Sequence, residues 1–472
     1  MCSADGETGT RKSFIAATIK FFSSWRGMHF FILAFVMAVA FSFIFPQKIE
    51  YDSTQYEHLG WNISQGNGLS DASAAPFVPT SGREPVYPLF ISLFYLFFGR
   101  HPEIVLVAQS LLHATTALLI YRLACRWFSL SVAGLAGFLT AVDPTLYGFC
   151  SYLLTEPLAL FLLASFVYLA VFVRERNGLA FSLAGGALLG ALALCRAVFM
   201  FLPVVFFVFM VFSRFPSKLG KRIVYGMILI LVFMSVLSPW LYRNKKAFGV
   251  AFITARSGEM LLWKALRTEH SPREMLVDLV YGTSDTLGRK LFPDDYSRMN
   301  ISGEHGPENV YPIGVERYMR YLADGYSELE ADRLLRIDAI RIIIKRPFKY
   351  IAQCFVDAWK LSFFEIVPFA YSTRFNQLMQ RGDCLLGLGT ALRILLRYVY
   401  SWLIILLAVK GFLEVQKEWR RKCLLLVPII YTIGTAIPFD VSGRYVYPAL
   451  PFILILASVS VVNFIERKQP SL

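Results

Sequence analysis

The stretch from Gly27 to Pro46 reads GMHFFILAFVMAVAFSFIFP and contains no Lys, Arg, Asp or Glu. About 20 consecutive apolar residues are enough for an α-helix to cross the hydrocarbon core of a bilayer, so this stretch predicts a membrane-spanning helix. Residues 1–26 carry basic side chains over a longer stretch than the basic region of a signal peptide, and no small-residue cleavage site follows the apolar run. We expect residues 1–26 to form a cytoplasmic segment that stays attached.

The composition of the whole chain agrees with a membrane protein. Of 472 residues, 56% are hydrophobic and 17% are charged, whereas soluble proteins usually carry about a quarter charged residues. The same figures exclude a disordered chain, because disorder requires low hydrophobicity. The net charge of +14 does not predict a nucleic-acid partner here, since membrane proteins collect Lys and Arg in their cytoplasmic loops.

Nine further apolar runs predict about ten spans in total, and therefore an all-α polytopic membrane protein. They lie at about 103–121, 129–145, 150–173, 179–195, 197–213, 223–241, 390–413, 423–439 and 447–465. Two other apolar segments fit interfacial helices better. Residues 86–98 are too short to cross, and residues 348–366 include Lys349, Asp357 and Lys360.

The basic residues predict the orientation of these spans. With a cytoplasmic N-terminus and both interfacial segments outside, every inner loop is basic, as the positive-inside rule requires. These loops contain Arg122 and Arg126; Arg174 and Arg176; Arg214, Lys218, Lys221 and Arg222; Lys417, Arg420, Arg421 and Lys422; and Arg467 and Lys468. Counting either interfacial segment as a full crossing breaks this pattern.

The predicted topology divides the chain into four parts. After the segment 1–26 comes a transmembrane catalytic module at 27–241 with an outer loop at 47–102, then an extracytoplasmic and interfacial segment at 242–389, and a second transmembrane module at 390–472. Within the third part, Ser327 and Glu330 have the spacing of a helix capping box. The helix that they start is expected to end before Pro347.

Charged side chains flank the predicted spans on the outer side. They are Asp52, Glu57, Arg83, Glu84, Asp143, Glu156, Arg196, Arg243 and Arg444. A charge at the bilayer centre costs about 2.5–3.5 kcal/mol, so charges beside spans are usually functional or lie near an interface. We expect these residues to form one outward-facing site at the depth of the lipid headgroups.

The residue types in this set indicate transfer chemistry on a lipid-linked phosphate. Arginine binds phosphate through two planar donors and stays charged, and a carboxylate can accept a proton from an attacking hydroxyl or amine. Two simpler interpretations stay open. Single arginines can anchor helices at the interface, and Asp52 can be an ordinary N-cap of the helix-compatible run from Gln55 to Gln65.

Six short motifs, in order along the chain, carry a resemblance to a known family. They are Asp52-Ser-Thr-Gln-Tyr56, Gln65-Gly66-Asn-Gly68, Arg83-Glu84-Pro85-Val-Tyr87-Pro88, Thr155-Glu156-Pro157, Pro239-Trp240-Leu-Tyr-Arg243-Asn244, and Gly443-Arg444-Tyr445-Val-Tyr-Pro448. The chain thus resembles the bacterial branch of the dolichyl-phosphate-mannose–protein mannosyltransferases, glycosyltransferase family 39. This branch is similar to the aminoarabinose transferases of lipid A and has the GT-C membrane fold.

The resemblance implies a GT-C-like bundle of about 10–12 transmembrane helices and a sugar donor carried on a polyprenyl phosphate. It implies transfer with inversion to a lipid, glycan or protein acceptor, at the outer face of the cytoplasmic (inner) membrane. Asp52 matches the catalytic acid of the family and is the expected general base, and Glu156 is expected to orient the sugar or the base. The expected substrate-binding residues are Tyr56, Arg83, Glu84, Tyr87, Arg196, Arg243, Asn244, Arg444 and Tyr445.

Several questions stay open at this level. A transporter or flippase of lipid-linked sugars is the main alternative function, and an O-antigen-type polymerase or ligase is a third. The six histidines form no HExxH motif, and Glu304-His305 is expected to be a solvated pair, so no cofactor is assigned and a divalent cation on the donor phosphate is left open. The sugar, the acceptor and the oligomeric state are not predicted.

Overall fold

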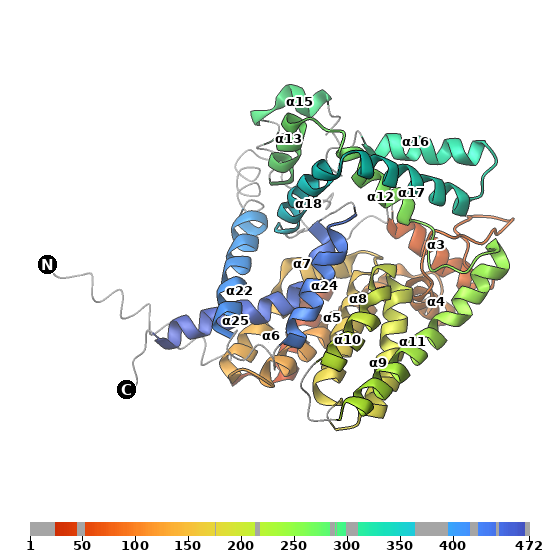
Figure 1. Ribbon diagram of the computed structural model, residues 1–472. Helices are drawn as coiled ribbons and strands as arrows, with labels where there is room; N and C mark the ends of the chain where they lie inside the picture. The colour runs from red at the N-terminus through yellow and green to blue at the C-terminus, as the bar shows by residue number, and fades with distance from the viewer. Residues whose placement is uncertain are drawn as a thin grey trace.

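The computed structural model describes a helical protein (Figure 1). It describes residues 24–44, 52–174, 176–212, 218–283, 288, 290–298, 310–363, 395–415, 423–439 and 443–467. All regular elements within these ranges are helices, which confirms the all-α prediction. The predicted cytoplasmic segment up to residue 23, Glu304-His305 and the basic loop 416–422 lie outside the described residues.

Among the described residues, seven helices are long and apolar enough to cross a membrane. They are α2 (Gly27–Ile44), α5 (Pro102–Cys125), the run of α6 (Leu130–Val142), α7 (Pro144–Gly148) and η1 (Phe149–Ser151), α9 (Gly178–Cys195), α11 (Leu219–Phe248), Tyr398–Val415 with α22 (Ser401–Val415), and α25 (Leu450–Arg467). Seven of the ten predicted spans are therefore confirmed, and the protein is a multi-pass membrane protein.

The other three predicted spans correspond to shorter apolar helices. These are α8 (Glu156–Phe172), η2 with α10 (Ala197–Phe212), and α24 (Leu426–Ala436) after the short helix η5 (Cys423–Leu425). The predicted interfacial segment 86–98 is helix α4 (Val86–Phe98), which at 13 residues is about 20 Å long and too short to cross the hydrocarbon core.

Helix α11 differs from its prediction because it continues past residue 241 to Phe248. Its end is set by Gly249, which has a left-handed φ of 79° and donates its backbone N–H to the carbonyl of Lys245. Lys245 and Lys246 in the last turn interact favourably with the negative end of the helix dipole. The chain therefore leaves α11 almost two turns later than the apolar run alone predicts.

Small residues bring the helices of the bundle into close contact. A Cβ atom added to Gly186 of α9 would lie 2.5 Å from the carbonyl oxygen of Leu229 in α11, and one added to Gly190 would lie 2.7 Å from Val236. Gly411 of α22 faces the carbonyl oxygen of Leu456 in α25 in the same way. Membrane helices pack through such small residues because lipid provides little hydrophobic driving force between helices.

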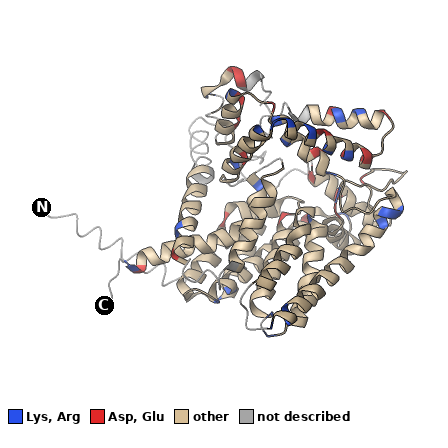
Figure 2. Ribbon diagram, viewed as in Figure 1, with Lys and Arg blue, Asp and Glu red and all other residues tan. Residues whose placement is uncertain are grey.

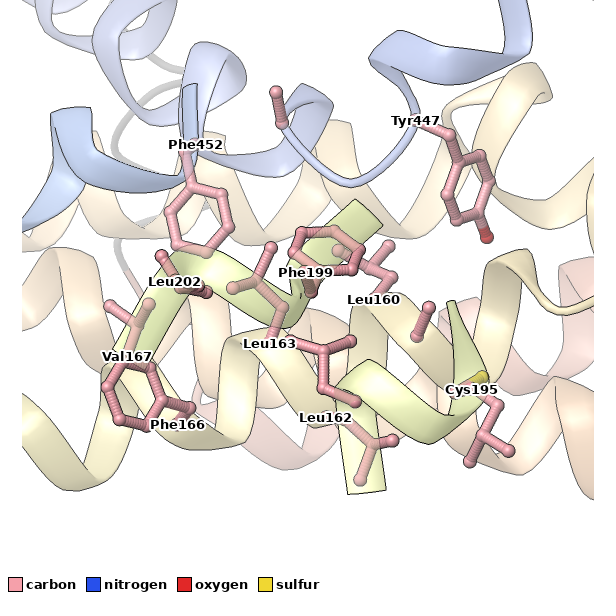
Figure 3. Close-up of a cluster of buried hydrophobic side chains, with 14 of the residues drawn as sticks. Leu160, Leu162, Leu163, Phe166, Val167, Cys195, Phe199, Leu202, Tyr447 and Phe452 are labelled. Carbon is pink, nitrogen blue, oxygen red and sulfur yellow. The ribbon is translucent and has the colours of Figure 1, made fainter. Parts of the chain in front are cut away.

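The central helix of the bundle is α8, whose side chains are buried on several faces. Figure 3 draws the core around it, where Leu163 lies beside Phe199 of η2 and Leu202 of α10, and Phe452 of α25 belongs to the same cluster. This packing fixes the start of α8, which carries Glu156, and the end of α9, which is followed by Arg196. Both residues supply charged groups to the site described below.

A group of helices that we name the helical cap covers one end of the bundle (Figure 1). It consists of α12 (Ser257–Arg267), α13 (Pro272–Thr283), α15 (Pro293–Arg298), α16 (Val310–Ala323), α17 (Glu328–Lys345) and α18 (Pro347–Leu361). The predicted capping box is confirmed, since Ser327 and Glu330 bond each other's backbone at the start of α17. In Figure 2 the bundle is largely tan, and many of the charged residues lie in the cap.

Buried ion pairs join the helices of the cap. Lys264 of α12 pairs with Asp357 of α18, and Lys360 of α18 binds both carboxylate oxygens of Asp278 in α13 at 2.7 Å. Burial raises the pKa of Asp278, but the positive charges of Lys360 and Arg267 outweigh it and hold the pKa at about 2. Asp357 and Lys360, two of the charged residues noted within residues 348–366, thus pair inside the cap and fix how its helices fit together.

We predict that Gly411→Ala destabilises the protein. The added methyl group would lie 1.9 Å from the carbonyl oxygen of Leu456, so α22 and α25 must separate, at a cost of about 1–3 kcal/mol. Thermal unfolding of the purified protein in detergent measures the effect. Gly434→Ala in α24 is the matched control, because no described atom lies within 4 Å of its added methyl group. Equal unfolding midpoints for the two variants would contradict the prediction.

Candidate active site

The site begins at the first residue of α3 (Asp52–Ser64), which follows the first membrane helix. Asp52, Gln55 and Tyr56 lie on one face of this helix, because residues three and four apart are neighbours there. Arg83 donates to all three, at 2.5 Å to Asp52 Oδ1, 2.6 Å to Gln55 Oε1 and 3.2 Å to the Tyr56 hydroxyl. The Arg83 residue is only 7% exposed, so these partners hold a desolvated guanidinium.

A second arginine reaches Asp52 from the far end of the chain. Arg444 lies in the short helix η6 (Gly443–Val446), which precedes α25. It donates to Asp52 Oδ2 at 3.1 Å, on the opposite carboxylate oxygen from Arg83. Arg256, which directly precedes α12 of the cap, lies 3.9 Å from Asp52 Oδ1. Asp52 is therefore surrounded by three guanidinium groups.

The second carboxylate of the site is Glu156 at the start of α8. It is 2% exposed and pairs with Arg196 at 2.9 Å, while Arg444 Nε lies 4.0 Å from the same oxygen. Arg444 thus connects Asp52 and Glu156. We name these five residues, Asp52, Arg83, Glu156, Arg196 and Arg444, the carboxylate–arginine cluster.

Two predicted residues border the cluster. The carboxylate of Glu84 accepts the backbone N–H of Ala197 at 3.0 Å, which ties the Arg83 loop to the segment after Arg196. The ring of Tyr445 lies 5.8 Å from the Arg196 guanidinium and 5.7 Å from that of Arg444. The structure therefore brings together Asp52, Tyr56, Arg83, Glu84, Glu156, Arg196, Arg444 and Tyr445 from the predicted set.

The charges of the cluster determine its protonation states. Burial alone raises the pKa of Asp52, but the positive charges of Arg83, Arg444 and Arg256 outweigh burial and hold the pKa well below its usual range. Burial raises the pKa of the Tyr56 hydroxyl to about 12, so this group is neutral at neutral pH. The arginines stay charged, and the cluster presents fixed cations to an anionic ligand.

Three other predicted residues make different contacts. The Tyr87 hydroxyl donates to Gln109 at 2.6 Å, and its ring packs edge-on against the Tyr56 ring at 5.1 Å. Tyr87 therefore helps to hold Tyr56 in place. Arg243 donates to the carbonyl oxygens of Thr80 at 3.2 Å and Leu69 at 3.4 Å, and to the side chain of Asn244 at 2.7 Å. Asn244 donates to the carbonyl of Phe252 at 2.7 Å.

Arg243 and Asn244 therefore hold the main chain of the loop and of the segment after α11. Because both lie at the end of a long helix, the sequence placed them correctly at this end of the bundle. Their partners depend on the path of residues 69–80, which no local pattern predicts. We leave both residues out of the proposed site.

Sequence reasoning missed two residues of the site. Gln55 stands inside the quoted motif Asp52-Ser-Thr-Gln-Tyr56, so helical spacing from Asp52 could have found it. Arg256 belongs to no motif and reaches Asp52 only because the cap folds over the bundle.

The described residues contain no group of three or more His, Cys, Asp or Glu side chains that could hold a metal ion. Asp52 and Glu156, the carboxylates of the cluster, are each engaged by arginines. Both carboxylates of the cluster thus already have cationic partners.

Comparison with known proteins shows which family part of the chain resembles. Residues 79–242, about a third of the chain, match the family described as dolichyl-phosphate-mannose-protein mannosyltransferase. This range includes Arg83, Glu84, Glu156 and Arg196. With the all-helical membrane fold, the match confirms the predicted resemblance. Over residues 79–242 the chain is thus similar to that family.

Solved structures similar to this chain include the oligosaccharyltransferase of Archaeoglobus fulgidus. Its apo form has a TM-score of 0.51 at 12% identity, over 94% of this chain and 51% of that one. The form tethered to an acceptor peptide has a TM-score of 0.50 at 12% identity, over 93% of this chain and 50% of that one. This chain thus spans about half the length of the oligosaccharyltransferase.

ArnT from Cupriavidus metallidurans, bound to undecaprenyl phosphate, matches with a TM-score of 0.40 at 14% identity, over 92% of this chain and 77% of that one. No curated protein sequence matches this chain. The matched family and both solved proteins are glycosyltransferases.

We predict that Arg83→Lys lowers stability although it keeps the charge. A lysine ammonium cannot reproduce the planar contacts with Asp52, Gln55 and Tyr56, and the polar groups left unpaired cost about 1–3 kcal/mol. Thermal unfolding in detergent measures the difference. Arg320→Lys, at an exposed i,i+4 pair with Glu316 in the cap, should unfold like the wild type. If Arg83→Lys also does so, Arg83 does not organise this site.

Proposed function

We propose that the protein is an integral-membrane glycosyltransferase that moves a sugar from a polyprenyl-phosphate donor to an acceptor. The observation that carries the proposal is the Asp52 carboxylate held between Arg83 and Arg444. The cluster combines a proton acceptor with cations for a phosphate, and it lies at one end of a membrane helix bundle.

The donor class follows from the chemistry of the cluster and from the matched family. Guanidinium groups suit phosphate because they bind it through two parallel hydrogen bonds. The family model that matches residues 79–242 is named after a dolichyl-phosphate sugar, which is a polyprenyl-type donor. A polyprenyl phosphate would keep its tail in the bilayer and bring its phosphate to the depth of the cluster.

The proposed reaction is a single displacement. The acceptor oxygen or nitrogen attacks the anomeric carbon of the sugar, the bond from that carbon to the phosphate oxygen breaks, and its electron pair stays on the phosphate. Asp52 takes the proton of the acceptor nucleophile. Attack from the face opposite the leaving phosphate inverts the anomeric centre.

The arginines of the cluster would stabilise the leaving phosphate. Arg83, Arg196 and Arg444 already lie around the two carboxylates before substrate arrives, so cations are in place where negative charge develops on the phosphate. Glu156 orients Arg196 and Arg444, and Tyr445 and Glu84 complete the border of the sugar site. Binding both substrates in line supplies much of the remaining acceleration.

We also propose which side of the membrane the cluster faces. Helices α8, α9 and α11 each have one end near the cluster, and basic residues lie at their other ends: Arg174 and Arg176 between α8 and α9, and Lys218, Lys221 and Arg222 at α11. By the positive-inside rule those ends are cytoplasmic. The cluster would then face the periplasm or cell exterior from the cytoplasmic membrane. The acceptor can be a lipid, a glycan or a protein.

We predict that Asp52→Asn abolishes transfer, because an amide cannot take a proton. The loss should be at least about 100-fold, the usual contribution of a general base. The measurement is mass spectrometry of envelope glycolipids and glycoproteins from cells in which the variant replaces the native protein. The product should be present with the wild type and absent with the variant.

Glu103→Gln is the matched control, since Glu103 is an exposed carboxylate at the start of α5. It should support normal glycosylation. Normal glycosylation by Asp52→Asn, at equal protein levels, would instead favour a flippase of lipid-linked sugars, which does not require a base.

A further inference from the structure

Asp52 has three arginine neighbours that come from three separate parts of the chain. Arg83 precedes α4, Arg256 precedes α12 of the cap, and Arg444 lies in η6 near the C-terminal helix. Their distances to the carboxylate oxygens are 2.5, 3.9 and 3.1 Å, respectively. A proton acceptor surrounded in this way is a weak base, which conflicts with the role proposed for Asp52.

The three arginines are held unequally. The side chain of Arg83 is 9% exposed, and its guanidinium has Gln55 and Tyr56 as further partners. The side chains of Arg256 and Arg444 are 31% and 29% exposed. Arg256 and Arg444 are therefore accessible to a ligand, whereas Arg83 is fixed.

Arg256 and Arg444 each have a second carboxylate close by. Arg256 lies 3.5 Å from Glu259, and Arg444 lies 4.0 Å from Glu156. Each can therefore move away from Asp52 without losing all carboxylate contact.

We propose that the donor phosphate displaces Asp52 from Arg256 and Arg444, so that the carboxylate becomes a free base only when the donor is bound. The inference rests on the function proposed above and assigns Arg256, which no motif identifies, as a phosphate-binding residue. In the resting protein Asp52 occupies the positions that the phosphate oxygens take in the complex.

Charge and geometry favour such an exchange. A carboxylate and a phosphodiester each carry one negative charge, and each accepts two parallel hydrogen bonds from a guanidinium. The phosphate can therefore replace the carboxylate without leaving an unpaired cation. Asp52 keeps Arg83 and loses two positive neighbours, so its affinity for a proton rises. The acceptor proton can then move to Asp52 as the bond between sugar and phosphate breaks.

Arg256 belongs to the segment through which the cap contacts the Arg83 loop. The backbone N–H of its neighbour Ala255 donates to the carbonyl of Ser81 at 3.0 Å, and Gly258 donates to Asp332 Oδ1 at 2.7 Å. Ser81 in turn donates to Glu328 of α17 at 2.5 Å. Arg256 therefore stands at the junction of the cap with the Arg83 loop, and it is held there by backbone contacts that do not depend on Asp52.

The test measures equilibrium binding of undecaprenyl phosphate to the purified full chain in detergent, which requires no knowledge of the sugar. If Asp52 competes with phosphate, Asp52→Asn should bind the probe about three- to tenfold more tightly than the wild type. Arg444→Gln and Arg256→Gln should bind about tenfold more weakly. Glu103→Gln and Arg320→Gln are controls for the change in net charge and should bind like the wild type.

A double variant separates competition from a general change in charge. The gain from Asp52→Asn should shrink when Arg444→Gln is already present, because the two side chains interact. If Asp52→Asn aggregates, Asp52→Ser removes the same charge and replaces it in the comparison. Equal or weaker binding by the folded Asp52 variant overturns the exchange, while a wild type that does not bind the probe overturns the proposed donor class itself.

Discussion

The pairing of Asp52 with Arg83 is the interaction on which the site depends. Moving either charge out of water is costly, and their contact at 2.5 Å offsets part of that cost for both. The guanidinium also binds Gln55 and Tyr56, so it aligns one face of α3 with the loop that leads into α4. The remaining charged residues of the cluster are arranged around this pair.

Close packing of the bundle keeps these charges at fixed separations. Glu156 begins α8 and Arg196 follows α9, and both helices are held by small residues and by the aromatic core that Figure 3 draws around Phe166. A bundle with looser packing would let the ends of the helices shift. Preorganised charge of this kind is what a transfer reaction on a phosphate leaving group requires, so the apolar core contributes to function by setting distances.

The helical cap has its own polar framework and contributes to the site at one edge. The pair between Lys264 and Asp357 is fully buried, and the Asp278–Lys360 pair lies beside it. Such pairs specify how helices fit together more than they add stability. Arg256, at the start of α12 in the cap, extends toward Asp52 of the bundle. The cap and the bundle therefore both contribute charged groups around this carboxylate.

The sequence by itself determined the helical class and most of the spans. Gly27–Ile44 and Val86–Phe98 could be predicted because apolar length is a local property, and the capping box of Ser327 and Glu330 because its atoms lie within one turn. Asp52 and Glu156 were among nine charged residues predicted beside the spans, because a charge there is costly, and the resemblance to the mannosyltransferase family singled out these two.

Only the tertiary structure decided which arginine binds which carboxylate. Arg243 and Arg444 were both predicted as charged residues beside a span, yet Arg444 binds Asp52 across 392 positions, while Arg243 binds the backbone near Thr80. Arg256 belongs to none of the sequence motifs and was not predicted as a site residue. The physical reason is that an ion pair depends on the positions of two charges in space, and contacts between distant segments follow from the packing of the whole bundle and its cap.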